Sequence, residues 1–261
     1  MKAKYDRIGE GYNATRKADP YLFSRLLTHL NPDPDGRYLD VGCGTGNYTK
    51  EFDKRGFAFT GMDPSRQMLD EAKNGENEVQ WVQGSADSLP FADAFFDGVV
   101  ATLTLHHWGD LRPGFQEVYR VLKPGTKWVI FTSDPVQMSH YWLCHYFPEL
   151  MRKGIEQMPK IKTITQTLTE VGFTGITSEL YSVQEDLQDL FLYSGKHQPE
   201  RYFDKDLRRG ISTFSDLANA SEVSAGLAQL RKDIDSGKIE EVIREWEYDG
   251  GDYIYLIANK E

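Results

Sequence analysis

The sequence predicts an α/β fold, in which a doubly wound, mostly parallel seven-stranded sheet carries helical cap insertions. Strand-like and helix-like segments alternate from residue 37 to residue 132, which is typical of parallel strands joined by helices on both faces of a sheet. A glycine-rich turn joins the first of these strands to the next helix. Glycine at such a turn allows the backbone to approach a ligand closely. After residue 135 the alternation stops and aromatic residues accumulate, which indicates an insertion.

Length, charge and cysteine content narrow the functional class. The 261 residues correspond to about 1.7 average domains, so we expect one elaborated domain or one domain with a smaller cap. The net charge of −10 argues against a broad nucleic-acid surface, because such binding depends on Lys and Arg. No run of about 18 apolar residues and no apolar N-terminal stretch occur, and Cys43 and Cys144 are too few for a disulfide framework. We expect a cytoplasmic protein without nucleic-acid or membrane partners, whose oligomeric state stays open.

The N-terminal segment, residues 1–30, is expected to form a helical lid. Its first part, residues 1–18, is polar with scattered aromatic positions. Asp19 and Pro20 are typical of an N-cap followed by proline at the first helical position. Five apolar residues then follow at helical spacing, namely Leu22, Phe23, Leu26, Leu27 and Leu30. The Pro- and Asp-rich stretch that comes next must end this helix.

Residues 31–135 are expected to form the ligand-binding core. The predicted strands cover residues 37–41, 57–62, 79–82, 96–103 and 126–132, and the predicted helices cover residues 47–55, 64–73 and 111–122. Residues 159–183 and 249–261 supply the remaining core helix and strands. The stretches between these parts, 136–158 and 184–248, are expected to form a helical cap on the functional edge of the sheet.

The glycine turn and the acids around it indicate the kind of ligand. Gly42, Gly44 and Gly46 have the spacing G-x-G-x-G, which is tighter than the G-x-G-x-x-G of dinucleotide loops. Asp40 precedes the first glycine by two residues, and its carboxylate suits a cationic ligand with an ammonium group. Asp63 ends the second predicted strand, where an acid accepts hydrogen bonds from ribose hydroxyls.

Four further stretches of the chain are landmarks beside the glycine turn. They are the loop Gly84–Phe91, the strand Phe95–Val100, the turn Leu122–Gly125 and the N-terminal segment Tyr5–Asn13. With the glycine turn, these stretches resemble class I S-adenosylmethionine-dependent methyltransferases, in the small-molecule branch that includes quinone-biosynthesis enzymes (methyltransferase type 11). The resemblance covers roughly residues 1–135. It implies a Rossmann-like sheet, S-adenosylmethionine as cofactor and S-adenosylhomocysteine as product.

The resemblance also implies the residues that hold the cofactor. The loop glycines would border the methionine moiety, Asp40 would reach its ammonium, and Asp63 would hold the ribose. Ser85 and Ala86 would meet the adenine. Relatives commonly have an acid or Asn at the position of Ser85, so Asp87 is an alternative acceptor. The full expected set is Tyr5, Tyr12, Asp40, Gly42, Gly44, Thr45, Gly46, Asp63, Pro64, Ser85, Ala86, Asp87 and Thr102.

His106 and His107 are the candidates for a catalytic base. They follow the fourth predicted strand, on the edge where ligands bind, and histidine can accept a proton near neutral pH. The alternative is that they pack under the cap or orient the substrate. His140 and His145 flank Cys144, but no further metal ligands are evident, so no metal site is predicted.

Aromatic residues of the predicted cap are candidates for the substrate pocket, because such pockets are lined by apolar and aromatic groups. Aromatic residues at helical spacing are, on the other hand, more often part of a core. The candidates are Tyr141, Trp142, Tyr146, Phe147, Phe191 and Tyr193.

The function expected from these observations is metal-independent methyl transfer to a small organic molecule, driven by proximity and desolvation. The sequence contains no Asn/Asp-Pro-Pro-Tyr/Phe stretch of amino-methylating nucleic-acid enzymes and no Pro-Cys of cytosine methyltransferases. The alternatives are a non-catalytic S-adenosylmethionine-binding regulatory protein, an NAD-dependent oxidoreductase and a protein methyltransferase. The acceptor atom (N, O, S or C) and the pathway stay open.

Overall fold

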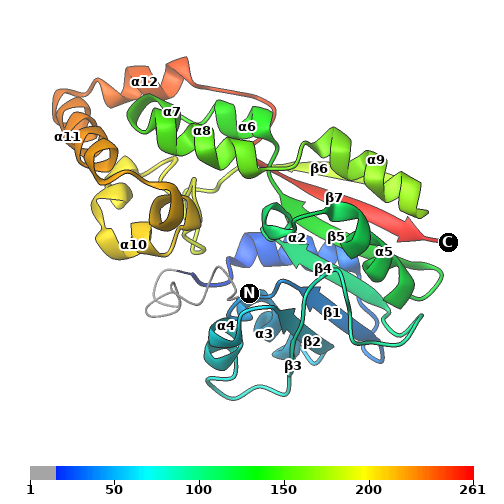
Figure 1. Ribbon diagram of the computed structural model, residues 1–261. Coiled ribbons are helices and arrows are strands. Elements are labelled where there is room, and N and C mark those ends of the chain that lie inside the picture. Colours follow the sequence, from blue (N-terminus) through cyan, green and yellow to red (C-terminus); the bar gives the residue numbers. More distant parts are fainter. Residues whose placement is uncertain (1–15) are drawn as a thin grey trace.

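A computed structural model describes residues 16–261 of the chain. Its centre is a seven-stranded sheet with the order β3-β2-β1-β4-β5-β7-β6 (Figure 1). The strands are β1 Arg37–Val41, β2 Ala58–Asp63, β3 Gln80–Gln83, β4 Gly98–Thr102, β5 Thr126–Thr132, β6 Thr174–Tyr181 and β7 Tyr253–Lys260. β7 runs antiparallel to both of its neighbours, whereas β1 to β5 are mutually parallel. The predicted mostly parallel seven-stranded sheet is therefore confirmed, with strand ends that differ by a few residues.

Helices cover both faces of the sheet. They are α2 Pro20–Leu30, α3 Asn47–Asp53, α4 Arg66–Ala72, α5 Leu111–Val121 and α9 Ile161–Val171. Successive residues of β4 point to opposite faces: Val100 packs with the apolar side chains of α2 and α3, while Val99 and Ala101 pack with those of α5 and α9. The strand order turns back between β1 and β4, and such a switch point creates a crevice at the carboxyl ends of the strands.

α2 shows how local sequence sets the start of a helix. The Asp19 carboxylate accepts a hydrogen bond from the backbone N–H of Leu22 at 2.8 Å, and Pro20 is the first helical residue. The predicted N-cap is therefore confirmed. α2 buries its apolar side chains against the sheet, so within residues 16–30 the segment is a covering helix. Residues 1–15, which carry half of the predicted lid with Tyr5 and Tyr12, lie outside the described residues.

The remaining helices gather beyond one edge of the sheet (Figure 1). They are α6 Pro135–Ser139, α7 Leu143–Tyr146, α8 Pro148–Gln157, the 3₁₀-helix η2 Pro199–Phe203, α10 Lys205–Arg209, the π-helix η3 Thr213–Leu217, α11 Ala220–Ser236 and α12 Ile239–Glu245. Helices that precede β6 in the chain contact helices that follow it: α7 contacts α11, and α8 contacts η3. We call this assembly, residues 135–158 and 184–248, the cap.

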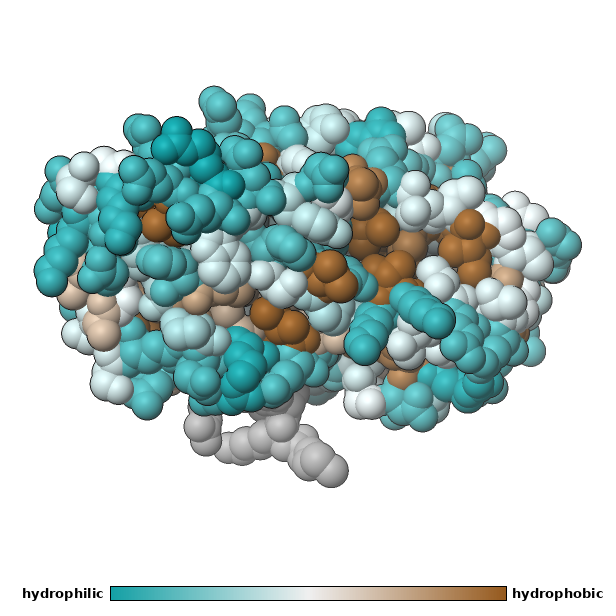
Figure 2. Space-filling view, turned by 90° about the horizontal axis from the view of Figure 1, so that it is seen from above, coloured by the Kyte–Doolittle hydropathy of each residue, from teal (hydrophilic) through white to brown (hydrophobic). Residues whose placement is uncertain are grey.

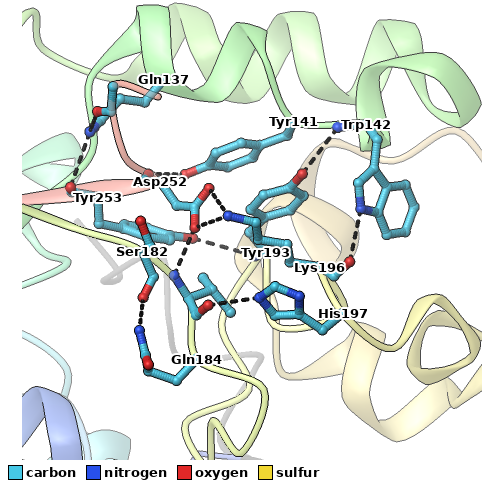
Figure 3. Close-up of polar contacts among 12 residues, drawn as sticks. Gln137, Tyr141, Trp142, Ser182, Gln184, Tyr193, Lys196, His197, Asp252 and Tyr253 are labelled. Carbon is cyan, nitrogen blue, oxygen red and sulfur yellow. Dashed lines mark hydrogen bonds and ion pairs between the residues drawn. The ribbon is translucent and has the colours of Figure 1, made fainter. Parts of the chain in front are cut away.

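A polar junction ties the cap to β7 (Figure 3). Asp252, just before β7, binds Lys196 Nζ through Oδ1 at 3.0 Å and Oδ2 at 2.8 Å, and Oδ2 also accepts from Val183 N at 2.7 Å. The Tyr141 hydroxyl donates to the Asp252 carbonyl oxygen. Gln137 Nε2 donates to the carbonyl oxygen of Tyr253 at 3.0 Å. Buried side chains of the cap and α2 also belong to one continuous apolar cluster, so the cap and the sheet share a core.

The surface seen from above is largely hydrophilic, with hydrophobic side chains in separate patches (Figure 2). Among the described residues, the exposed large hydrophobic side chains are Tyr21, Val136, Leu180 and Tyr248. No helix of the described part is long and apolar enough to cross a membrane.

Candidate active site

A cavity of about 680 Å³ lies between the carboxyl ends of β1, β2 and β4 and the cap. Its volume is within the range of small-molecule sites. One side is built by the glycine turn after β1, the end of β2 and the loops after β3 and β4. The other side is built by α6, α8, the segment before η2 and the segment that leads into η3. The predicted cofactor site and the cap therefore meet in a single cavity.

The three glycines of the turn have different physical roles. All three have left-handed backbone angles, with φ of 75° at Gly42, 56° at Gly44 and 72° at Gly46, which only glycine adopts readily. A Cβ at Gly42 would lie 2.1 Å from Thr104 Oγ1, and one at Gly46 would lie 2.1 Å from the Trp81 indole. A Cβ at Gly44 would meet nothing within 4 Å. Gly42 and Gly44 line the cavity, whereas Gly46 does not and instead makes room for Trp81.

Asp40 places a buried carboxyl group in the cavity wall. Its Oδ2 accepts a hydrogen bond from the Thr49 hydroxyl at 2.6 Å. Its Oδ1 has no hydrogen-bond partner among the described residues. Burial raises the pKa of this carboxyl group to about 7. Because buried polar atoms are almost always paired, the free oxygen indicates a ligand with a hydrogen-bond donor.

Asp63 connects the end of β2 to the glycine turn. Its Oδ2 accepts from the backbone N–H of Gly44 at 2.9 Å, and its Oδ1 accepts from that of Ser65 at 2.8 Å. Burial raises the pKa of Asp63. Each carboxylate oxygen can accept a second hydrogen bond, so this side chain can still bind hydroxyl groups.

Most of the predicted cofactor-binding residues come together in the cavity. Those that line it are Asp40, Gly42, Gly44, Thr45, Asp63, Pro64, Ser85, Ala86, Asp87 and Thr102. They come from different loops but meet at the edge of the sheet, because parallel strands end there.

His106 and His107 also line the cavity. They belong to a single 3₁₀ turn, η1 Leu105–His107, that directly follows β4. Their ring centroids lie 3.8 Å apart with an interplanar angle of 50°. The structure therefore places two imidazoles at the same wall, and both stay candidates for a base.

Five of the six aromatic pocket candidates do not line the cavity, which corrects the prediction for Tyr141, Trp142, Tyr146, Phe147 and Tyr193. These side chains are buried in the core of the cap. The rings of Tyr141 and Tyr193 stack with centroids 3.8 Å apart, and Trp142 N donates to the Tyr193 hydroxyl at 3.3 Å (Figure 3). Aromatic spacing alone could not distinguish these packing roles from a pocket role. Phe191 is the candidate that does line the cavity.

An ion pair at the cavity wall was not predicted from the sequence. Arg16 Nε lies 2.5 Å from Oδ1 of Asp189, whose Oδ2 accepts from the Tyr48 hydroxyl at 3.0 Å. All three residues line the cavity, and the Asp189 carboxylate is only 2% exposed. Asp19 Oδ2 also accepts from Gln188 N at 3.0 Å. These contacts hold the segment before η2 against α3 and the chain before α2. No periodicity or spacing relates residues so far apart in the sequence.

The wall on the cap side is mainly apolar. Its apolar side chains are Met138, Met158, Phe191, Leu192, Ile211 and Leu217. Among the described residues, no group of three His, Cys, Asp or Glu side chains is arranged to hold a metal ion.

Comparison with known proteins identifies relatives of the core. A family model described as "Methyltransferase domain" matches residues 39–130. The chain is 33% identical over 133 residues to malonyl-[acyl-carrier protein] O-methyltransferase of Erwinia pyrifoliae, which covers 51% of this chain and 50% of that protein. It thus spans about half the length of this curated relative. An uncharacterized methyltransferase of a Synechocystis species is 30% identical over 164 residues, which cover 60% of this chain and 75% of that protein.

Solved structures extend the similarity into the cap. A protein of Anabaena variabilis, described as a methyltransferase from an antibiotic biosynthesis pathway, superposes with a TM-score of 0.84 at 29% identity. The alignment covers 94% of this chain and 99% of that one. Phosphoethanolamine N-methyltransferase 2 of Haemonchus contortus, solved with S-adenosyl-L-methionine, shares the fold with a TM-score of 0.62 at 18% identity, over 97% of this chain and 56% of that one. Together with the glycine turn, Asp63 and the sheet order, these similarities show that the chain belongs to the methyltransferase-domain family of class I S-adenosylmethionine-dependent methyltransferases.

Proposed function

We propose that this protein transfers a methyl group from S-adenosylmethionine to a small organic molecule that is bound under the cap. The observation that carries this proposal is the joint cavity, in which the free oxygen of Asp40 and the mainly apolar cap wall face the same space. One side offers a site for the cofactor and the other side offers a site for an acceptor.

The residues of the first side fit the cofactor. Asp40 Oδ1 would pair with the ammonium of the methionine moiety, because it is buried and lacks a partner among the described residues. Gly44 leaves open space next to its own backbone, and a side chain at this position would fill that space. Asp63 would accept hydrogen bonds from the ribose hydroxyls, and Ser85, Ala86 and Asp87 would border the adenine. When bound, the cofactor supplies an activated methyl group on a sulfonium.

The protein then contributes by positioning and by excluding water. Methyl transfer forms a bond between the acceptor atom and the methyl carbon, and it breaks the methyl–sulfur bond, whose electron pair stays on sulfur. The part-buried ion pair between Arg16 and Asp189 holds the segment that carries Phe191 and Leu192 over the cavity. Holding two reactants in a suitable geometry contributes on the order of 7–11 kcal/mol to catalysis.

His106 or His107 takes the proton that an O–H, N–H or S–H acceptor loses. The support is their position in the cavity wall directly after β4, together with the ability of imidazole to accept a proton near neutral pH. We further propose that residues 136–158 and 184–248 act as the substrate cap, that residues 1–30 carry the lid, and that the protein works in the cytoplasm without nucleic-acid or membrane partners. The net charge of −10 supports the exclusion of nucleic acids.

Acceptor-dependent formation of S-adenosylhomocysteine tests this proposal. Purified protein is incubated with S-adenosylmethionine and either the small-molecule or the macromolecular fraction of a cell extract. We expect product formation with the small-molecule fraction and only the acceptor-free rate with the macromolecular fraction. Activity confined to the macromolecular fraction would contradict the substrate class. Cofactor binding without turnover in either fraction would instead favour a non-catalytic role.

A further inference from the structure

We infer that the acceptor is an uncharged aromatic molecule, and this inference rests on the proposed function. The first support is the composition of the cap-side wall. Two thioethers, one aromatic ring and three aliphatic side chains line it, from Met138, Met158, Phe191, Leu192, Ile211 and Leu217. Methionine sulfur makes favourable contacts with aromatic rings. Such a wall therefore favours a ring system over a strongly hydrated group.

The second support is the distribution of charge. Within the described part of the chain, Arg16 is the only Lys or Arg that lines the cavity, and its guanidinium is paired with the buried carboxylate of Asp189. The other carboxyl groups in the lining belong to Asp40, Asp63, Asp87 and Asp110. A phosphate, sulfonate or carboxylate on the acceptor would therefore enter an acidic cavity and lose its hydration. Burying such an anion without a cationic partner is strongly unfavourable.

The third support is the set of neutral polar groups on the same wall. Gln157, Ser212 and Thr213 line the cavity from the end of α8 and the start of η3. They can hydrogen-bond a hydroxyl, amine or carbonyl without a change in charge. A few such groups in an apolar wall typically fix the orientation of an uncharged ligand.

Two features of the local backbone support the assignment of this wall as a ligand-binding surface. Gly154 lies inside α8, where a Cβ would come within 3.0 Å of Thr213 Cγ2, so glycine allows α8 and η3 to approach closely. η3 is a π-helix, a rare conformation that often occurs at functional sites. Both features lie where the wall carries its polar groups.

A matched pair of ligands tests the inference. Naphthol and naphtholsulfonate share one ring system and differ by an anionic group. Their binding to the full-length protein is measured by calorimetry, with and without saturating S-adenosylhomocysteine. We expect naphthol to bind at least about tenfold more tightly than naphtholsulfonate in both series, because the sulfonate would be desolvated without a cation. Equal or tighter binding of naphtholsulfonate, or no binding of naphthol, would overturn the inference.

Two variants, one at the N-cap of η3 and one within η3, locate the effect. Ser212→Lys adds a cation to the cavity wall, and we expect it to raise naphtholsulfonate affinity about tenfold relative to naphthol. Ser215→Lys is the control, since Ser215 is exposed on the same π-helix and does not line the cavity. The same change in both variants would place binding elsewhere and contradict the inference. If Ser212→Lys does not fold, the wild-type comparison still decides.

Failure of the inference about the acceptor can be distinguished from failure of the proposed methyl transfer. The titration with S-adenosylhomocysteine is read independently of the naphthol pair. Failure to bind S-adenosylhomocysteine, with the preference for naphthol intact, refutes methyl transfer but leaves the preference of the cavity for uncharged ligands in place. Binding of S-adenosylhomocysteine with a preference for naphtholsulfonate refutes only the acceptor class.

Discussion

Thr49 donates a hydrogen bond from its hydroxyl to Oδ2 of Asp40 at 2.6 Å. This contact fixes a buried carboxyl group in the cavity wall and leaves its Oδ1 without a partner among the described residues. Burial raises the pKa of Asp40 to about 7. In the proposed function, cofactor binding at this carboxyl group would therefore be coupled to a proton equilibrium near neutral pH.

The first prediction concerns the pH dependence of cofactor affinity. In the proposed function the ionised form of Asp40 would pair with the ammonium, so the protonated form would first have to lose its proton. Because the pKa in the free protein is about 7, affinity for S-adenosylmethionine should fall by about fivefold as the pH decreases from about 7 to 6. Calorimetry at several pH values measures this slope. Asp40→Asn should bind more weakly and with a flatter profile, and equal slopes in the two proteins would contradict the role of Asp40.

The second prediction separates two glycines of the turn. Gly44→Ala places a methyl group in open space, whereas Gly46→Ala places one against Trp81. Both substitutions carry the strain of a positive φ. We expect Gly46→Ala to lose a further 1–3 kcal/mol or so of unfolding free energy through overpacking. Gly44→Ala should weaken cofactor binding by about tenfold or more. Denaturant unfolding and calorimetry distinguish these effects, and identical behaviour of the two variants would refute the assignment.

The third prediction concerns the ion pair between Arg16 and Asp189. Arg16→Met leaves a buried carboxylate without its cation, which typically costs about 3–5 kcal/mol. The double variant Arg16→Met/Asp189→Asn removes the charge as well and should be more stable than the single variant. Arg152→Met serves as the control, because Arg152 pairs with exposed Glu149 and Glu156. The unfolding free energy of this control variant should stay close to that of the wild type, because exposed ion pairs contribute little to stability. Denaturant unfolding measures all three, and a double variant no more stable than Arg16→Met would contradict this account.

The fourth prediction decides between the two histidines. His106→Ala and His107→Ala are assayed separately with an acceptor that loses a proton. Loss of the general base should reduce kcat by about 100- to 10,000-fold, remove one limb of the pH profile and leave cofactor affinity unchanged. The other substitution should have a much smaller effect. Two rates close to wild type would mean that both imidazoles only pack or orient.

The order of motifs in the sequence was sufficient to predict the sheet and one side of the cavity. Gly42, Asp63 and His106 are far apart in the sequence, yet each lies at or just beyond the carboxyl end of a parallel strand. Parallel strands end at a common edge, so strand assignment alone brings these residues together. The antiparallel β7 was predicted as a strand, and its pairing between β5 and β6 completes the sheet.

The cap could not be predicted at the level of single residues. Tyr141 and Tyr193 were expected in the pocket but stack on each other, because their surroundings depend on contacts between segments about 50 residues apart. Asp189 and Arg16 meet for the same kind of reason. Gly46 carries the family motif but serves the packing of Trp81, which spacing alone could not reveal.

The most direct test of the central claim is a calorimetric titration of the protein with S-adenosylmethionine and S-adenosylhomocysteine, with NAD as control. Wild-type protein should bind the first two with micromolar dissociation constants and should not bind NAD. Asp63→Ala should weaken their binding by about 1.5–3 kcal/mol, the value of a hydrogen bond to a charged group. Folded protein that binds neither S-adenosylmethionine nor S-adenosylhomocysteine, or that binds NAD as tightly, would contradict the account.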